Sequence, residues 1–297
     1  MWKKQVKAQR YHQSYRHPLY NSYVWIKKPF PEGTCLVIGH RGSSISYPEN
    51  TLLAFREAIS EEAGGVECDI YKTSDGQYVI IHDTTVDRTT DGTGTVSNLT
   101  LDYIKTLDAG SWKGAEFANR EDTKVPTLDE FLEEFRGLPI FLMLQVKLGL
   151  TDVKAILDIV ESKKMLNQCF IFTSTSLLQE VKQYKPKAFV MNDGTSHQAS
   201  SLLPTAIEQS WDAISTNSNN YTVEDIALAK ENKILIQHSF IASDFAAKTQ
   251  SLIDLGFNFI LGDDCASMMS VANANGVDQI KPIQIRSFSN ETWEITN

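Results

Sequence analysis

Short apolar runs alternate with amphipathic stretches along most of this chain. Eight apolar runs after residue 33 have the length and the bounding residues of β-strands, and stretches with helical spacing separate most of them. The predicted strands are residues 35–39, 66–71, 140–146, 169–173, 188–191, 213–215, 234–237 and 258–261.

Four of the stretches between these strands carry helix signals. In residues 51–60 the apolar side chains fall on one face, and Asn50 precedes them as the expected N-cap. Thr127 and Glu130 are spaced as a capping box at the start of residues 127–136. The other two predicted helices are residues 222–231, with Thr222 as the cap, and residues 244–255.

Eight strand–helix units in succession predict one TIM-type (β/α)₈ barrel, a fold that often takes up a chain of this length as a single domain. A further apolar run, residues 78–81, is expected to return antiparallel as the second strand of a hairpin. Residues 84–125 then break the alternation, and we interpret them as a small insertion over the barrel mouth. The predicted organisation is a basic, aromatic N-terminal segment, residues 1–33, followed by one barrel domain, residues 34–297.

Charge is distributed unevenly along the chain. The formal net charge of −9 argues against a nucleic-acid partner. Residues 1–31 nevertheless hold seven Lys or Arg and no Asp or Glu, with Tyr11, Tyr15, Tyr20, Tyr23 and Trp25 among the basic residues. We favour an amphipathic segment that caps the closed end of the barrel, and the alternative is an arm that binds a membrane surface or a partner.

Neither a membrane span nor a secretion signal is apparent in the sequence. No apolar stretch is long enough to cross a bilayer, and the N-terminus lacks the apolar core of a signal peptide. We expect a cytoplasmic protein if no leader has been trimmed from the chain. Cys35, Cys68, Cys169 and Cys265 lack C-x-x-C spacing, so we expect buried free thiols.

The most informative polar residues lie at or near the ends of predicted strands. His40 and Arg41 close the first strand, Glu67 and Asp69 lie in the second, and His82 follows the hairpin strand. Hard divalent cations prefer carboxylate oxygens, phosphate is bound well by guanidinium, and imidazoles transfer protons near neutral pH. This combination indicates metal-assisted chemistry on a phosphate diester.

A turn signal links two of these groups. Residues 74–77, Ser-Asp-Gly-Gln, separate the two apolar runs of the predicted hairpin. If the hairpin is centred on this turn, position 69 faces position 82, so that Asp69 and His82 become cross-strand neighbours. Side chains alternate along a strand, so Glu67 shares a face with Asp69 while Cys68 points the other way.

Each of these residues also has an ordinary structural explanation. Histidines and arginines often cap loops at strand ends, and Lys147 could extend its charge from a strand end into solvent. Glu67 and Asp69 are harder to explain in this way, because unpaired carboxylates in a buried run are costly without a cation or hydrogen-bond donors. The joint occurrence of all these residues favours a catalytic site.

A series of short motifs connects these residues to a known family. The motifs are Gly39-His40-Arg41-Gly42, Pro48-Glu49-Asn50-Thr51, Glu67-Cys68-Asp69-Ile70, Asp75-Gly76, His82-Asp83, the run from Arg88 to Gly94, and Pro126-Thr127-Leu128. Together they cover roughly residues 38–147, and their order resembles the glycerophosphodiester phosphodiesterase family. The resemblance implies a TIM-type barrel with a small insertion after the second histidine, which matches residues 84–125.

The resemblance also implies roles for the site residues. It implies a divalent cation, Mg²⁺ or Ca²⁺, on two carboxylates, a pair of histidines as general acid and base, and two cationic residues that hold the substrate phosphate. The matching residues are, in that order, Glu67 and Asp69, His40 and His82, and Arg41 and Lys147. Which histidine is the acid stays open, as does whether water or a substrate hydroxyl is the nucleophile.

The chain departs from the family pattern at several strand ends. The family usually has Glu-x-Lys at the end of the third barrel strand, with that Glu as a metal ligand, and this chain has Gln145-Val146-Lys147. An amide oxygen can ligate a hard cation without charge, so we expect weakened rather than abolished metal binding. Residues 236–239 and Gly262-Asp263 also differ from the family, at strands that usually shape the alcohol side of the pocket.

We therefore interpret the chain as a metal-dependent phosphodiesterase that hydrolyses glycerophosphodiesters to glycerol 3-phosphate and an alcohol. Its expected partner is a small-molecule phosphodiester. Two alternatives stay open. One is a phospholipase-type phosphodiesterase acting on intact lipid, which membrane contact through residues 1–31 would favour. The other is a catalytically impaired binding relative, which Gln145 suggests.

Overall fold

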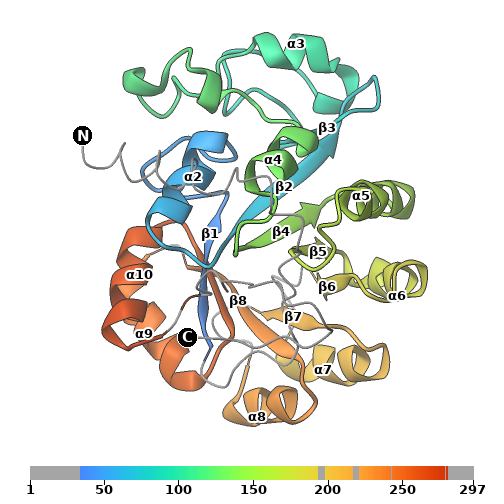
Figure 1. Ribbon diagram of the computed structural model, residues 1–297, viewed down its shortest axis with the longest axis vertical. Helices are drawn as coiled ribbons and strands as arrows, with labels where there is room; N and C mark the ends of the chain where they lie inside the picture. Colours follow the sequence, from blue (N-terminus) through green and yellow to red (C-terminus); the bar gives the residue numbers. More distant parts are fainter. Residues whose placement is uncertain (1–33, 193–197, 217–220, 242, 278, 280–297) are drawn as a thin grey trace, which may run out of the picture.

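Eight strands close into a parallel barrel in the computed structural model, with helices packed around the outside (Figure 1). The barrel closes because β1 (Leu36–His40) pairs in parallel with both β2 (Gly65–Lys72) and β9 (Phe259–Gly262). The predicted TIM-type (β/α)₈ fold is thus confirmed. The predicted N-terminal segment, residues 1–33, lies outside the described residues, which are 34–192, 198–216, 221–241, 243–277 and 279.

The remaining strands and helices follow the alternation expected from the sequence. The other barrel strands are β4 (Phe141–Val146), β5 (Cys169–Thr173), β6 (Phe189–Asn192), β7 (Ala213–Thr216) and β8 (Leu235–Ile241). The helices are α2 (Leu52–Ser60), α3 (Leu101–Thr106), α4 (Leu128–Phe135), α5 (Leu150–Ser162), α6 (Thr175–Tyr184), α7 (Ala199–Glu208), α8 (Val223–Glu231), α9 (Phe245–Leu255) and α10 (Cys265–Ala274).

Apolar side chains fill both sides of the barrel wall. Inside the barrel, Phe141 and Phe170 pack edge to face with 5.2 Å between ring centroids, and Phe259 packs against both. Leu142 and Leu144 of β4 belong instead to the cluster between the strands and the surrounding helices. Because side chains alternate along a strand, burial of both faces makes each strand apolar nearly throughout. The polar side chains of the barrel interior are left for the carboxyl ends of the strands.

The hairpin between β2 and β3 (Tyr78–Ile80) is shifted by one residue from the predicted register. Asp69 lies opposite Ile81, whose N–H donates to the Asp69 carbonyl over 3.0 Å, and not opposite His82. The turn contains an odd number of residues, because Thr73 N–H bonds the carbonyl four positions later, and Gly76 adopts a φ of +83°. This is a three-residue loop that ends in a left-handed glycine, whereas the prediction assumed an even loop.

Two of the three predicted helix caps are confirmed. Thr127 and Glu130 form the capping box of α4, and Thr222 caps α8. Asn50 is not the cap of α2. Thr51 has that role, with its hydroxyl accepting the N–H of Ala54, while Asn50 adopts a φ of 56°. Both residue types are good N-caps, so sequence alone did not separate them.

Residues 84–125 pack on the hairpin with a small apolar cluster of their own. The cluster includes Val86, Val96, Ile104 and Leu107, and it covers β3. Besides α3, the segment contains short 3₁₀ helices at Val96–Asn98, Ala115–Phe117 and Glu121–Thr123. In Figure 1 it lies at the top of the molecule, next to α2 and α4.

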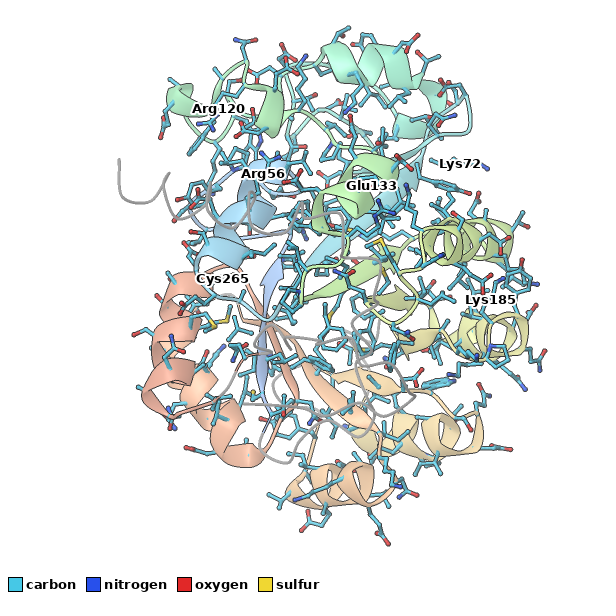
Figure 2. All side chains as sticks on the ribbon, in the orientation of Figure 1. Arg56, Lys72, Arg120, Glu133, Lys185 and Cys265 are labelled. Atoms are coloured by element: carbon cyan, nitrogen blue, oxygen red, sulfur yellow. The ribbon has the colours of Figure 1, made fainter. Side chains whose placement is uncertain are left out.

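The four cysteines are free and buried, as predicted. Cys265, labelled in Figure 2, begins α10 beside β1, and its Sγ is close to Gly39, where an added Cβ would lie only 2.9 Å away. Burial raises the pKa of the Cys35 thiol to about 12, so this group behaves as a small apolar side chain. Among the described residues, no helix has both the length and the apolar character needed to cross a bilayer.

Candidate active site

The predicted site residues gather where β1, β2 and β4 end. His40 pairs with Glu67 across β1 and β2, and Asp69 pairs with Gln145 across β2 and β4. Glu67 and Asp69 share a face opposite Cys68, as predicted, and because Cys68 belongs to the outer apolar cluster, that face is the barrel interior. Lys147 follows β4 directly. This carboxyl end of the barrel is where active sites of the fold lie.

A tight turn after β1 aims Arg41 back across the mouth. Gly42 N–H donates to the Gly39 carbonyl over 3.1 Å, and Arg41 itself has a φ of 55°. Gly42 has a φ of +87°, and a Cβ there would lie 2.5 Å from the backbone carbon of Ala54, so only glycine fits. The backbone N–H of Arg41 donates to Glu67 Oε2 over 3.1 Å, which fixes the turn against β2.

Asp69 is fully buried and surrounded by donors. Lys147 Nζ lies 2.8 Å from its Oδ1, and Arg41 Nε lies 3.3 Å from its Oδ2. Asn50 Nδ2 donates to the same Oδ2 over 2.9 Å, and the Asp69 backbone N–H donates to Asn50 Oδ1. Asn50 thus holds this carboxylate and does not cap a helix. Arg41 and Lys147, the two cationic residues predicted to hold the phosphate, are therefore both in contact with Asp69.

Glu67 is buried beside Asp69 with one oxygen left over. Its Oε2 accepts the Arg41 N–H, but its Oε1 has no hydrogen-bond partner among the described residues. Burial raises the pKa of Glu67 well above its usual value, and the charge of Asp69 raises it further. An orphaned carboxylate oxygen in a pair of adjacent buried acids fits a site for a hard cation.

Gln145 is the third group available to a cation at this position. It lies beside Asp69 in the strand register, on the same face of the barrel wall. In the part of the chain that the structure describes, no three His, Cys, Asp or Glu side chains are clustered as a metal site. A ligand set here would therefore consist of two carboxylates and one neutral amide.

Each histidine is held by a carboxylate through the same ring atom. His40 Nδ1 lies 2.8 Å from Asp263 Oδ1, and His82 Nδ1 lies 2.6 Å from Asp83 Oδ1. A carboxylate accepts but does not donate, so Nδ1 carries the proton in the neutral ring and Nε2 is the acceptor nitrogen. Burial lowers the pKa of His82, and the charges of Arg41 and Lys147 lower it further. Together they outweigh the raising effect of Asp69 and Asp83, which favours the neutral ring.

Sequence reasoning did not assign a role to either carboxylate partner. Asp83 could have been found, because it is adjacent to His82 in a matching motif. Asp263 is 223 positions from His40, and only closure of the barrel brings the two together. Lys147 and His82 also meet in a way that the sequence did not show, because Lys147 Nζ donates to the His82 carbonyl over 3.2 Å.

A larger hollow of about 250 Å³ lies apart from these residues, between α2, α4 and the insertion. Three of its four charged side chains already have partners, since Lys105 pairs with Glu130, and Lys124 donates to the Lys105 carbonyl. We therefore place the chemistry at the barrel mouth, where the histidines and the buried carboxylates meet. A smaller hollow there is lined in part by Glu49, Asn50, His82 and Thr89.

Comparison with known proteins places this geometry in a family. Residues 40–238 match the model of the glycerophosphoryl diester phosphodiesterase family. A glycerophosphodiester phosphodiesterase of Caldanaerobacter subterraneus subsp. tengcongensis is 30% identical over 251 residues, which cover 81% of this chain and 99% of the relative.

Two solved structures share the fold. A glycerophosphodiester phosphodiesterase from Agrobacterium tumefaciens superposes with a TM-score of 0.69 and 25% identity, covering 80% of this chain and all of that one. A phosphodiesterase from Oleispira antarctica, solved with the product sn-glycerol-3-phosphate, gives 0.66 and 25% over 81% of this chain and 96% of that one.

The class of protein follows from these findings. The chain is a phosphoric diester hydrolase built on a TIM-type barrel. It belongs to the glycerophosphoryl diester phosphodiesterase family, and hydrolysis of glycerophosphodiesters is the activity that the family and its named relatives support.

Proposed function

We propose that this enzyme uses a divalent cation to hydrolyse glycerophosphodiesters to glycerol 3-phosphate and an alcohol. One observation carries the proposal. Two imidazoles, each anchored at Nδ1 by a carboxylate, share the barrel mouth with a buried carboxylate pair that has an oxygen without a hydrogen-bond partner. The product bound to the Oleispira antarctica relative, sn-glycerol-3-phosphate, supports the same substrate class.

Arg41 and Lys147 hold the phosphate in this scheme. Both cations already lie at Asp69, with Lys147 Nζ 2.8 Å and Arg41 Nε 3.3 Å from its oxygens, and both side chains are partly open to solvent. Non-bridging phosphate oxygens would take up the donors that Asp69 leaves unused. Fixed positive charges in a partly buried site stabilise the negative charge that builds up in the transition state.

His40 and His82 move the protons. One ring starts neutral, and its Nε2 accepts the proton of the attacking hydroxyl. The other ring starts as the imidazolium and donates its Nε2 proton to the oxygen of the leaving alcohol as the P–O bond breaks. The carboxylates at Nδ1 keep the rings oriented and stabilise the imidazolium that forms. The attacking hydroxyl belongs to water or to a neighbouring group of the substrate.

Glu67, Asp69 and Gln145 are the residues that would hold the cation, Mg²⁺ or Ca²⁺. The orphaned Glu67 Oε1 and the position of Gln145 beside Asp69 fit such a group. When bound, the cation polarises a phosphoryl oxygen and offsets negative charge. A neutral amide in place of a third carboxylate lowers the charge of the ligand set, so the chain should bind its metal less tightly than a carboxylate variant.

The test is release of glycerol 3-phosphate from glycerophosphocholine and glycerophosphoethanolamine, with Mg²⁺, Ca²⁺ or a chelator. We expect release that the chelator abolishes. Gln145→Glu should reach half-maximal activity at a metal concentration about tenfold lower, because it adds a charged ligand. Gln183→Glu, the same change on the exposed face of α6, should leave the metal dependence unchanged.

Other outcomes of this assay would contradict parts of the proposal. If release of glycerol 3-phosphate is undiminished in the presence of chelator, the reaction does not depend on a divalent cation. If neither the native chain nor Gln145→Glu releases product, and metal titration shows no binding at millimolar concentration, the chain is an impaired binding relative. Cleavage of intact phospholipid in vesicles, with co-sedimentation of the protein, would instead point to a lipid substrate.

A further inference from the structure

One side chain of the insertion lies between the two halves of the proposed site. Arg88 donates through Nε to Asp83 Oδ2 over 2.6 Å, and its Nη2 lies 3.2 Å from Asp83 Oδ1. The same guanidinium donates to Glu49, with Nη1–Oε2 at 2.8 Å and Nη2–Oε1 at 2.7 Å. A planar fork that engages two carboxylates, each through two contacts, fixes both in one plane.

Each of these two carboxylates also holds one residue of the proposed site. Asp83 holds His82 Nδ1, and Glu49 Oε1 accepts from Arg41 Nη1 over 2.8 Å. Positive and negative groups therefore alternate from the loop after β1 to the end of the hairpin. The order of contacts is Arg41, Glu49, Arg88, Asp83 and His82.

The electrostatics of the chain of contacts agree with the geometry. Hydrogen bonds from Arg88 are the main reason that the pKa of Asp83 falls to about 2. Burial alone would raise the pKa of Glu49, but Arg88 and Arg41 outweigh it and bring that pKa to about 2 as well. Both groups are thus acceptors throughout the neutral range, and each is shared between Arg88 and one residue of the site.

We propose that Arg88 is a positioning residue that sets the orientation of His82 and Arg41 together, through Asp83 and Glu49. Arg88 contacts neither His82 nor Asp69 directly in any of these bonds, so it acts on the reaction through other side chains. The inference rests on the proposed roles of His82 and Arg41. In this chain of contacts, Arg88 is the residue that links Asp83 to Glu49. Because Arg88 belongs to the insertion, the insertion contributes to the geometry of the site.

The variants are Arg88→Ala and Arg88→Lys, with Arg120→Ala as the matched control. Arg120 lies in the same insertion, makes a bidentate pair with Asp122 and has a side chain 43% exposed, like that of Arg88. Figure 2 shows Arg120 in the part of the insertion above α2, and its ion pair with Asp122 involves no proposed site residue.

The kinetic readout is the hydrolysis of glycerophosphocholine at saturating metal. We expect kcat to fall about 10- to 100-fold in Arg88→Ala, in the range found when an orienting partner of a site residue is lost. Arg88→Lys should stay impaired, because a single ammonium cannot engage both carboxylates as a fork. Millimolar methylguanidinium should restore part of the kcat of Arg88→Ala, and Arg120→Ala should match the native enzyme.

A second readout does not depend on turnover. The Nδ1–H protons of His40 and His82, each held by a carboxylate, should give separate downfield proton resonances at low temperature, assigned with His40→Ala and His82→Ala. In folded Arg88→Ala only the His82 resonance should shift or exchange away, while that of His40 is the internal control. If the native chain is inactive, the proposed function fails, but the resonance measurement still tests whether Arg88 orients His82.

The proposal is overturned by either of two results. One is native kcat in folded Arg88→Ala. The other is an unchanged His82 resonance in that variant. If Arg88→Ala does not fold, the same two readouts are taken on Arg88→Lys, for which native kcat and an unchanged His82 resonance would equally overturn it.

Discussion

The imidazoles of His40 and His82 are each oriented by a carboxylate, and the two carboxylates come from different parts of the chain. Each donates Nδ1–H to a carboxylate, and each therefore presents Nε2 as the atom that can exchange a proton with substrate. Asp83 is next to its histidine in sequence, whereas Asp263 follows the last barrel strand. A reaction that removes one proton and delivers another needs two such side chains, one neutral and one protonated at Nε2 when it begins.

Replacing either imidazole should stop this exchange without unfolding the protein. We expect His40→Ala and His82→Ala each to lower kcat by about 10² to 10⁴, the usual contribution of a general acid or base. Both rings are partly exposed, so the midpoint of urea unfolding should change little. Substantial turnover in either purified, folded variant would contradict the assignment of that histidine.

Single residues were predictable where their chemistry is local. Glu67 and Asp69 were recognisable because two acids in an apolar run need compensation. The structure supplies it to Asp69 through Arg41, Lys147 and Asn50, whereas Glu67 Oε1 has no hydrogen-bond partner among the described residues. The pairing of His40 with Asp263 had no such signal. It depends on where the last strand meets the first, which no short sequence pattern records.

At the scale of elements, the alternation of strands and helices was predicted reliably and two of three helix caps were, but the turn geometry was not. The strands of the barrel were visible because both of their faces are buried. The predicted hairpin register was wrong by one position, because the turn residues do not indicate whether the loop has an even or an odd number of residues. His82 still reaches the mouth, since it lies beyond the last paired residue and is oriented by Asp83.

The capping box of α4 allows the contribution of one helix end to the free energy of unfolding to be measured. Thr127 Oγ1 accepts the N–H of Glu130 over 3.1 Å, and Glu130 Oε2 accepts the N–H of Thr127 over 2.8 Å. Thr127→Ala should lower the free energy of unfolding by about 1 kcal/mol, measured by urea denaturation. Ser174→Ala is the control, because Ser174 begins α6 without a side-chain cap bond, and an equal loss there would contradict the argument.

For the whole molecule, one buried histidine outside the site should make stability depend on pH. His238 of β8 is 1% exposed, packs against Phe257, and has no hydrogen-bond partner for Nδ1 among the described residues. Burial lowers its pKa to about 4, and the charge of Lys248 adds to the effect. The neutral ring is therefore the form that the folded state accepts.

The sign of the effect follows from this lowered pKa. The unfolded chain takes up a proton near pH 6.5 and the folded chain only near pH 4, so stability is intact above pH 6.5 and declines as the pH falls toward 4. The loss should be roughly 3 kcal/mol, measured by urea unfolding between pH 7 and 4. His238→Asn removes the titrating group, and an equally steep decline in that variant would assign the effect to other residues.

The pairing of His40 with Asp263 has a consequence for how the enzyme is made. Synthesis runs from the N-terminus, so His40, Arg41, Glu67, Asp69 and His82 all leave the ribosome long before Asp263 does. A nascent chain can thus hold most of the proposed site residues while His40 still lacks its carboxylate. On the proposed mechanism, the site is complete only when β9 joins β1 and closes the barrel.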